Sequence, residues 1–301
     1  MAGSSPGRGV SIRGPWAGSL VGRGSRIVLW LVLAVAVVSG VALWWRGRSG
    51  PEVLQWGDRP LVLVYHTHAT EGFLPDLPGG QRPDRDIHRD AFTRDARRSV
   101  RALGQAVARR LAERGLDVIW SGTVYDAAGR DDAYERARAG LEDLLRRHPS
   151  VRVALDIHRD ATSTRVQVGG QPAAGVLLVV GAGHPGWHQN LALAQALADR
   201  LNRIHPRLVR GIALKPWHYN QDLLPGALIV EIGGAENTLA ESLRTARWVA
   251  DALVEALSIR PGEEPARPTL LPPPGSPQAR GDPGDIGNIF IPLEAHAPAG
   301  P

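Results

Sequence analysis

The sequence predicts an α/β fold: a single globular domain with a mostly parallel, twisted sheet flanked by helices, behind an N-terminal transmembrane helix. Two observations lead to this prediction. Short apolar runs of strand length alternate with longer segments in which apolar residues recur at helical spacing. A 19-residue uncharged segment precedes them. The 301 residues, of which 43% are hydrophobic and 22% charged, have the composition of a globular protein.

The uncharged segment is residues 27–45, IVLWLVLAVAVVSGVALWW. As a helix it extends roughly 30 Å, the thickness of the hydrocarbon core of a membrane. Four arginines precede it and two follow, so residues 1–26 are expected in the cytoplasm and the rest of the chain outside the cell membrane. A cleaved signal peptide and a buried core helix are the alternatives. The Trp-Trp-Arg ending disfavours a cleavage site, so we expect an uncleaved single-pass anchor.

Apolar runs that follow this segment predict the strands of the sheet. They are PLVLVY, LDVIW, VRVALDI, GVLLVV and ALIVEI, at residues 60–65, 116–120, 151–157, 175–180 and 227–232. Runs this apolar are typical of strands buried on both faces, as in parallel sheets. Because ligands of such sheets bind beyond the carboxyl ends of the strands, the residues after each run are the first candidates for a functional site.

Helical spacing of apolar residues separates the strands. The pattern predicts helices near 96–111, 191–204 and 239–253, and a more charged helix over 131–147. Thr238 and Glu241 have the spacing of a capping box and predict where the last helix begins.

These elements fall within one block, residues 58–260, which we expect to be a single domain. Residues 46–57 are predicted to be a linker between the block and the membrane segment. Residues 261–301 hold 11 of the 24 prolines and are predicted to be a disordered, Pro/Gly-rich tail.

Composition excludes several classes of function. The chain has no cysteine, which excludes disulfide frameworks, thiolate zinc sites and cysteine nucleophiles. The net charge of +5 comes from the first 50 residues, which hold six arginines and no acidic residue. A protein that binds nucleic acid needs positive charge on its folded domain, so no nucleic-acid partner is expected.

Chemistry-bearing side chains follow three of the predicted strands. The first strand runs into Tyr-His-Thr-His with His66 and His68, the third into Asp-Ile-His-Arg-Asp with His158, and the last contains Glu231. Imidazoles and a carboxylate at one sheet edge suit Zn²⁺. Glu231, an acid within an apolar strand, is costly unless paired or near a metal, and is placed to act as a general base.

Two points stay open at this stage. If the first strand continues, His66 and His68 share one face and both are candidate ligands; otherwise only the outer one is. A second Asp-Ile-His-Arg-Asp, at residues 86–90, has no apolar strand before it and is interpreted as a loop.

At these motifs the sequence resembles the stage II sporulation protein P family. The resemblance rests on LVLVYHTHATEGFLP at 61–75, VALDIHRDA at 153–161 and HYNQDLLPGALIVEIGGAENTLAES at 218–242. The three stretches occur in the family's order, and the resemblance covers nearly all of 58–258.

The resemblance implies a membrane-anchored, zinc-dependent N-acetylmuramoyl-L-alanine amidase, similar in fold to other cell-wall amidases and associated with cleavage of peptide cross-links. It matches His68, Glu71 and His158 with metal ligands, and Glu231 with the catalytic glutamate. Glu71 stands in Thr-Glu-Gly where the family often has Ser-Glu-Ser. The implied partners are peptidoglycan, a lytic transglycosylase and a polytopic membrane protein that act together in engulfment during sporulation.

Substrate contacts are also expected. Asn220 and Gln221 lie in a stretch of the family pattern, with a loop role equally open, and Arg159 or Arg94 is expected to steer an anionic stem peptide. A non-catalytic wall-binding scaffold of a membrane complex is the alternative function. A metal-dependent amidohydrolase of small metabolites is a third, although about 200 residues are few for the barrel that those enzymes commonly use.

Overall fold

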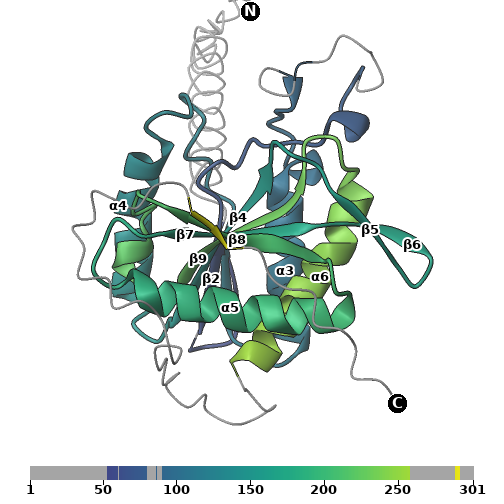
Figure 1. Ribbon diagram of the computed structural model, residues 1–301. Helices are drawn as coiled ribbons and strands as arrows, with labels where there is room; N and C mark the ends of the chain where they lie inside the picture. Colours follow the sequence, from purple (N-terminus) through teal and green to yellow (C-terminus); the bar gives the residue numbers. More distant parts are fainter. Residues whose placement is uncertain (1–52, 60, 80–85, 87–89, 258–288, 292–301) are drawn as a thin grey trace, which may run out of the picture. The chain divides into compact units, whose positions relative to one another are not determined.

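The computed structural model describes residues 53–59, 61–79, 86, 90–257 and 289–291. Helices and strands alternate along most of this part of the chain (Figure 1). The strands are β1 (Val53–Trp56), β2 (Val62–Tyr65), β3 (Val118–Ser121), β4 (Val153–Asp160), β5 (Arg165–Val168), β6 (Gln171–Ala174), β7 (Val176–Gly181), β8 (Val209–Lys215), β9 (Ala227–Gly234) and β10 (Ile289–Ile291). The helices are α3 (Val100–Glu113), α4 (Ala133–Arg147), α5 (Trp187–Ile204) and α6 (Leu239–Ala256), with short 3₁₀ turns η1 (Leu74–Asp76), η2 (Ala96–Arg98) and η3 (Gln221–Leu223).

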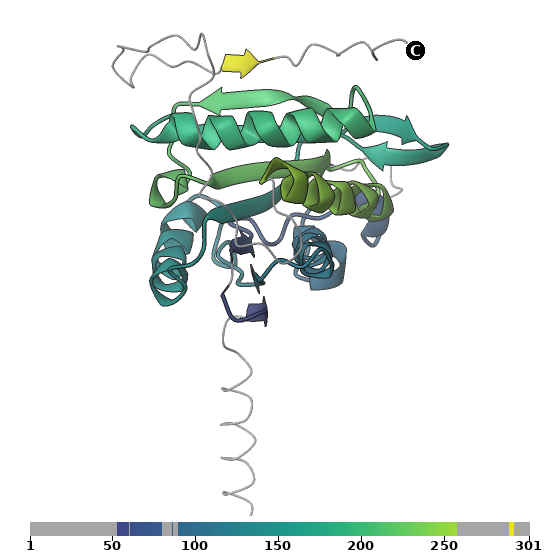
Figure 2. The same ribbon diagram turned by 90° about the horizontal axis from the view of Figure 1, so that it is seen from below.

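The main sheet is mixed. Its strand order is β1-β3-β2-β4-β9-β7-β8-β10, and Figure 2 shows the strands stacked from the dark blue β1 to the yellow β10. The neighbours β3, β2, β4 and β9 run parallel, as do β7 and β8. The pairs β1–β3, β7–β9 and β8–β10 are antiparallel. Four of these seven pairings are parallel and three are antiparallel. The sheet is therefore mixed, and the prediction of a mostly parallel sheet is not confirmed.

The direction of β7 follows from its connection to β4. A parallel strand needs a crossover of a dozen or more residues back to the starting edge. Between β4 and β7 the chain forms only the β5–β6 hairpin, which projects from the body of the domain in Figure 1. It therefore re-enters the sheet at the edge where β4 ends, and β7 runs opposite to β9.

The two faces of the sheet are covered unequally. Alternate side chains of each strand point to opposite faces. Val62 and Val64 of β2 pack into the large core formed with α3, α5 and α6, whereas Leu63 and Tyr65 pack into a smaller core beneath α4. The same alternation places Leu155 and Ile157 of β4 in the large core. Asp156 and His158 therefore lie on the α4 face.

β9 repeats this pattern. Leu228, Val230 and Ile232 belong to the large core, and Ile229 belongs to a small cluster on the opposite face. Glu231 therefore faces the α4 side, like His158, its direct neighbour in the parallel register of β4 and β9. The acidic side chain of this apolar strand thus points away from the large core.

The five predicted strands and the four predicted helices are present with shifts of a few residues at their ends. The capping box of α6 is confirmed: the Thr238 hydroxyl accepts from the Glu241 amide at 3.1 Å, and the Glu241 carboxylate accepts from the Thr238 amide at 2.9 Å. A residue of this kind at an N-cap typically contributes about 1 kcal/mol to stability.

Besides the β5–β6 hairpin, three strands of the main sheet lie where none was predicted. β8 was hidden because Arg210 and Gly211 interrupt its apolar run. β1 lies in the predicted linker, and β10 in the predicted tail. Gly211 makes the β8–β10 pairing possible, since a Cβ there would lie 2.4 Å from the Phe290 ring.

The predicted membrane segment, residues 27–45, and most of the predicted tail lie outside the described residues. Among the helices that the structure describes, none combines the length and the apolar character of a membrane span.

Candidate metal centre

The loop after β2 is held in place by two buried aspartates. Strand β2 ends at Tyr65. The Thr67 amide and hydroxyl then donate to the Asp156 carboxylate at 2.8 and 2.6 Å. Further on, the Thr70 amide and hydroxyl donate to Oδ2 of Asp126 at 3.1 and 2.5 Å. These bonds turn the chain so that the residues between and after the threonines lie against the end of β4.

Three side chains converge at this point: His68, Glu71 and His158. One ligand atom from each lies within 4.8 Å of the others. Nδ1 of His158 is 3.2 Å from Oε2 of Glu71, and Nδ1 of His68 is 3.7 Å from Oε1 of the same carboxylate. The His68 and His158 rings meet edge to face, with centroids 5.2 Å apart. Two imidazoles and a carboxylate are a donor set suited to Zn²⁺.

Asp156 orients His158 from the side away from Glu71. Its Oδ1 lies 2.9 Å from Nε2 of His158, in a contact bent away from a linear hydrogen bond. Burial alone would lower the pKa of His158, but the carboxylates of Asp156 and Glu71 raise it well above its usual value. A carboxylate behind a ligating histidine fixes the ring and raises its basicity. Sequence reasoning gave Asp156 no role.

The charges of the other two cluster members follow from their neighbours. Burial and the nearby His158 lower the pKa of His68 to about 4, which keeps its imidazole neutral. Burial opposes ionisation of Glu71, but His158, Arg159 and Arg130 together bring its pKa well below the usual range. Metal ligands must be a neutral imidazole and an ionised carboxylate. These pKa shifts favour the required forms of His68 and Glu71, whereas His158 must lose a proton when a metal binds.

Arg130 places a positive charge between two of these residues. Its Nη2 donates to Oε1 of Glu71 at 2.9 Å and lies 3.0 Å from Nδ1 of His68. The guanidinium also stacks over the Phe92 ring at 4.9 Å. In this structure a cation thus lies where His68 and Glu71 converge, which supports the fit of these donors to a metal ion. No pattern in the sequence points to Arg130, because it comes from the loop before α4.

Glu231 lies beside the cluster on the neighbouring strand. It pairs with His158 across β4 and β9, and its Oε2 is buried without a hydrogen bond to protein. Burial raises the pKa of Glu231 to about 8, with His158 opposing the rise and Glu71 adding to it. A carboxyl group whose pKa is near neutrality is suited to both accepting and returning a proton.

His66, the alternative ligand, lies outside the cluster. Because β2 ends at Tyr65, His66 and His68 do not share a strand face. Nδ1 of His66 lies 2.9 Å from the Ile157 carbonyl, and its Nε2 accepts from the Trp120 indole at 3.1 Å. The ring lies against Gly104 of α3, where a Cβ would be 2.3 Å from it. Both of its ring nitrogens are occupied by protein groups.

Arg159, predicted to steer substrate, is buried and bonded to protein. Its Nε donates to the Gly72 carbonyl at 3.1 Å and its Nη2 to the Ala91 carbonyl at 3.0 Å. Its backbone amide donates to Oε2 of Glu71 at 3.1 Å. In this position Arg159 positions Glu71 and the loop around it; substrate steering by Arg159 or Arg94 stays a prediction.

Asn220 and Gln221, like Arg159, are bonded to protein groups. Both are buried. The Asn220 amide donates to the Tyr134 carbonyl at 2.8 Å. The Gln221 side chain accepts from the Gly181 amide and donates to the Val179 carbonyl, both at 2.9 Å. These bonds hold the loop before β9 against the sheet, and direct substrate contact by these two amides stays a prediction.

Sequence comparison matches most of this domain to a known family. The family model for "Stage II sporulation protein P (SpoIIP)" matches residues 48–254. The chain belongs to the stage II sporulation protein P family. The stage II sporulation protein P of Bacillus subtilis (strain 168) is 30% identical over 222 residues, which cover 69% of this chain and 54% of that protein. The chain thus spans about half the length of this SpoIIP relative.

Solved structures show more distant likenesses to this SpoIIP chain. Two are N-acetylmuramoyl-L-alanine amidases. AmiC2 of Nostoc punctiforme is 13% identical, with 68% of this chain and 100% of that chain covered and a TM-score of 0.39. The amidase from Clostridium difficile 630 is 16% identical, with 67% and 96% covered and a TM-score of 0.37. A succinylglutamate desuccinylase/aspartoacylase from Rhodobacter sphaeroides is 14% identical, with 70% and 60% covered and a TM-score of 0.40. Likenesses at this level carry no argument about activity.

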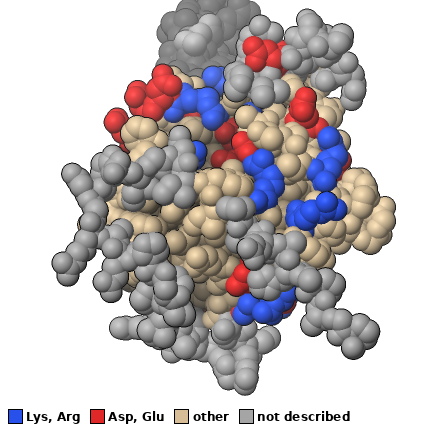
Figure 3. Space-filling view, viewed as in Figure 1, with Lys and Arg blue, Asp and Glu red and all other residues tan. Residues whose placement is uncertain are grey.

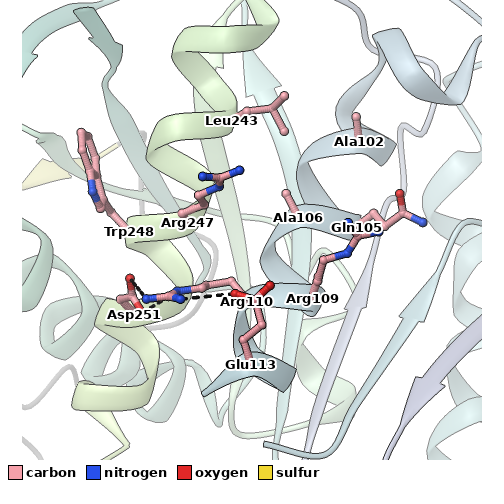
Figure 4. A pocket seen from close by; sticks show the side chains of 10 residues that line it. All are labelled: Ala102, Gln105, Ala106, Arg109, Arg110, Glu113, Leu243, Arg247, Trp248 and Asp251. Atoms are coloured by element: carbon pink, nitrogen blue, oxygen red, sulfur yellow. Dashed lines mark hydrogen bonds and ion pairs between the residues drawn. The ribbon is translucent and has the colours of Figure 1, made fainter. Parts of the chain in front are cut away.

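A groove of about 630 Å³ lies between α3 and α6 (Figure 4). None of its lining residues belongs to the metal cluster. Asp251 of α6 accepts hydrogen bonds from Arg110 of α3 at 3.0 and 3.2 Å and a further one from Arg114. On the face in Figure 3, basic side chains occur in separate groups, several with acidic side chains beside them.

Proposed function

We propose that this chain is a zinc-dependent N-acetylmuramoyl-L-alanine amidase that hydrolyses the amide between N-acetylmuramic acid and L-alanine in peptidoglycan. The observation that carries the proposal is the convergence of His68, Glu71 and His158, with Glu231 on the next strand, in a member of the SpoIIP family. Metal-assisted amide hydrolysis needs imidazole and carboxylate ligands and a nearby carboxyl group with a raised pKa.

The three cluster residues would hold the zinc ion. The chemistry supplied by zinc in such a position is Lewis acidity toward a water and toward the amide carbonyl. The protein prepares the donors beforehand: Asp156 holds the His158 ring, and the Arg159 amide and the Arg130 guanidinium hold the Glu71 carboxylate. Arg130 must leave at least part of this position when the ion is bound, because like charges repel.

Glu231 moves the proton in this proposal. Its unpartnered Oε2 accepts a proton from the attacking water, and the same carboxyl group returns it to the amine of the departing L-alanine. Burial favours this role because it raises the basicity of the Glu231 carboxylate. With the elevated pKa, the carboxyl group can hold the proton and then return it near neutral pH.

Location and partners are further parts of the proposal, and they rest on the resemblance and on residues 27–45. The domain acts on the outer side of the cell membrane, anchored by a single N-terminal span. It remodels septal peptidoglycan in engulfment during sporulation, beside a lytic transglycosylase and a polytopic membrane protein. Cleavage of peptide cross-links is a second activity that the same metal site would support.

The test uses purified full-length protein and purified peptidoglycan. Digests with zinc, with chelator, and with chelator followed by zinc are analysed by mass spectrometry. We expect free stem peptides with an L-alanine N-terminus, lost on chelation and restored by zinc. Fragments cut only at cross-links would replace the amidase by an endopeptidase. No release by folded, zinc-loaded protein would contradict the proposal and favour a wall-binding scaffold.

A further inference from the structure

The segment between β8 and β9 contains two consecutive residues in an unfavourable backbone conformation. Tyr219 has φ 49° and Asn220 has φ 59°, the left-handed region that L side chains rarely adopt. In the part of the chain that the structure describes, these are the non-glycine residues with positive φ. For a bulky aromatic residue this conformation costs free energy, and such strain persists where the surroundings impose it, most often at functional sites.

The surroundings of this segment do impose it. Asn220 is fixed by its bond to the Tyr134 carbonyl, and Gln221 by its bonds to Gly181 and Val179 of β7. The Asn190 amide donates to the Gln221 carbonyl at 3.1 Å. At Gly181 a Cβ would lie 2.4 Å from the Trp217 carbonyl oxygen, so only glycine admits the loop at this distance. Several independent contacts therefore hold the backbone of Tyr219 in place.

The Tyr219 ring is separated from the metal cluster by one aromatic ring, that of Tyr134. The ring contacts the Tyr134 ring, with centroids 5.2 Å apart. Tyr134 in turn meets His68 edge to face at 5.4 Å. Tyr219 also packs on the small apolar cluster that contains Ile229, on the sheet face that carries Glu231. Tyr219 is thus linked to His68 through Tyr134, and it lies on the same face of the sheet as Glu231.

The phenolic hydroxyl of Tyr219 is available to a ligand. It makes no hydrogen bond to any described residue, and the side chain is only partly buried. Burial, with a further contribution from the charge of Glu231, raises the pKa of Tyr219 to about 12. The hydroxyl therefore stays protonated at physiological pH and can donate a hydrogen bond.

We propose that Tyr219 is a catalytic residue whose hydroxyl donates a hydrogen bond to the carbonyl oxygen of the scissile amide as negative charge develops on it. The inference rests on the proposed amidase function. A donor fixed before substrate binds stabilises the transition state more than the ground state, because no reorganisation is needed when the charge appears. This explains why the chain keeps a strained tyrosine at a position where glycine would relieve the strain.

The test compares wild type, Tyr219→Phe and a matched control, Tyr125→Phe, as full-length proteins. Tyr125 packs in the small core beneath α4, with no contact to the metal cluster among the described residues. The substrate is a synthetic N-acetylmuramyl peptide. We expect Tyr219→Phe to lower kcat about 10- to 100-fold with KM changed less than about twofold. Zinc affinity and Tm should match those of wild type, and Tyr125→Phe should keep full activity.

Tyr219→Gly provides a second variant, because it removes the ring and relieves the positive φ together. We expect it to lose at least as much kcat as Tyr219→Phe while remaining folded. An active wild type with an unchanged kcat in Tyr219→Phe would overturn the role of Tyr219 and leave the proposed function standing. A rise in KM alone would also overturn it. An inactive wild type would overturn the amidase proposal itself.

Discussion

At Glu231, a carboxyl group lies in an apolar strand without a hydrogen bond to its Oε2. If this group moves the proton, Glu231→Gln should retain the fold and bind zinc as wild type does, because the amide has the same shape and Glu231 is not one of the cluster donors. Turnover should fall by at least about 100-fold. Peptide release and zinc content, measured on the same preparation, check this; a variant with wild-type turnover would contradict the role.

Arg130 leads to a prediction about metal affinity. Its guanidinium bonds to two of the three candidate ligands, so metal binding must displace its charge or tolerate it. Arg130→Gln should therefore bind zinc about tenfold more tightly at low salt, and less so at high salt because the side chain is partly exposed. Competition with a chromophoric chelator measures this. Arg146→Gln, at the other end of α4, is the control and should leave affinity unchanged.

Sequence reasoning named the residues that the structure brings together, and it missed Arg130 and Asp156, which contact them; the catalytic role of Glu231 stays a prediction. His68, Glu71 and His158 were predictable because strand ends and a family motif point to them, and the structure brings them together. The role of Arg130 depends on the path of a loop that is distant in sequence, which no local pattern encodes. Asn220 and Gln221 share a motif with Tyr219. The motif alone does not distinguish the residues that hold the loop in place from the residue whose side chain the loop presents to the site.

At the scale of elements, the N-terminus of α6 allows a prediction with a pH dependence. Burial opposes ionisation of Glu241, but Asn237, the Thr238 amide and Arg165 together lower its pKa below the usual value. A group with a lowered folded-state pKa stabilises the fold above its unfolded pKa, and this contribution is lost as pH falls through the folded value. Glu241→Gln should therefore destabilise the protein by about 1 kcal/mol at pH 7 and by less near pH 3.

Thr238→Ala is the matched control for this prediction. It removes the other half of the capping box and should cost about 1 kcal/mol at every pH between 3 and 7, because a hydroxyl does not titrate there. Urea unfolding of both variants and of wild type at several pH values measures the difference. If the destabilisation by Glu241→Gln stayed constant with pH, the charge of Glu241 would not contribute to the stability of the cap.

Strand direction marks the limit of what periodicity predicts. Apolar runs located β2, β3, β4, β7 and β9 because each is buried. The same runs carry no information on direction, which depends on how the chain returns to the sheet. The only sequence signal was the lack of a helical pattern between β4 and β7, a stretch that forms the β5–β6 hairpin instead. β10 was unpredictable because its partner, the edge of β8, lies far away in sequence.

For the whole molecule, a metal bound at the candidate site would link β4 with the loop after β2, which come from distant segments of the chain. A ligand that binds only the folded state stabilises it by mass action: zinc at 100 times its Kd adds about 2.7 kcal/mol. For a domain of this size that raises Tm by roughly 5–10 °C. Calorimetry of full-length protein with chelator and with zinc should show this shift.

The shift must depend on the cluster if the metal binds there. His68→Ala removes one donor from the most exposed position of the three, so the fold should persist while the zinc-dependent rise in Tm disappears. His188→Ala is the matched control: this histidine stacks on Trp187 at the start of α5, away from the cluster, and the shift should remain. Tm responds to zinc binding at any strong site. An undiminished shift in His68→Ala would therefore mean that the stabilising zinc binds elsewhere, and the shift would no longer support the proposed metal centre.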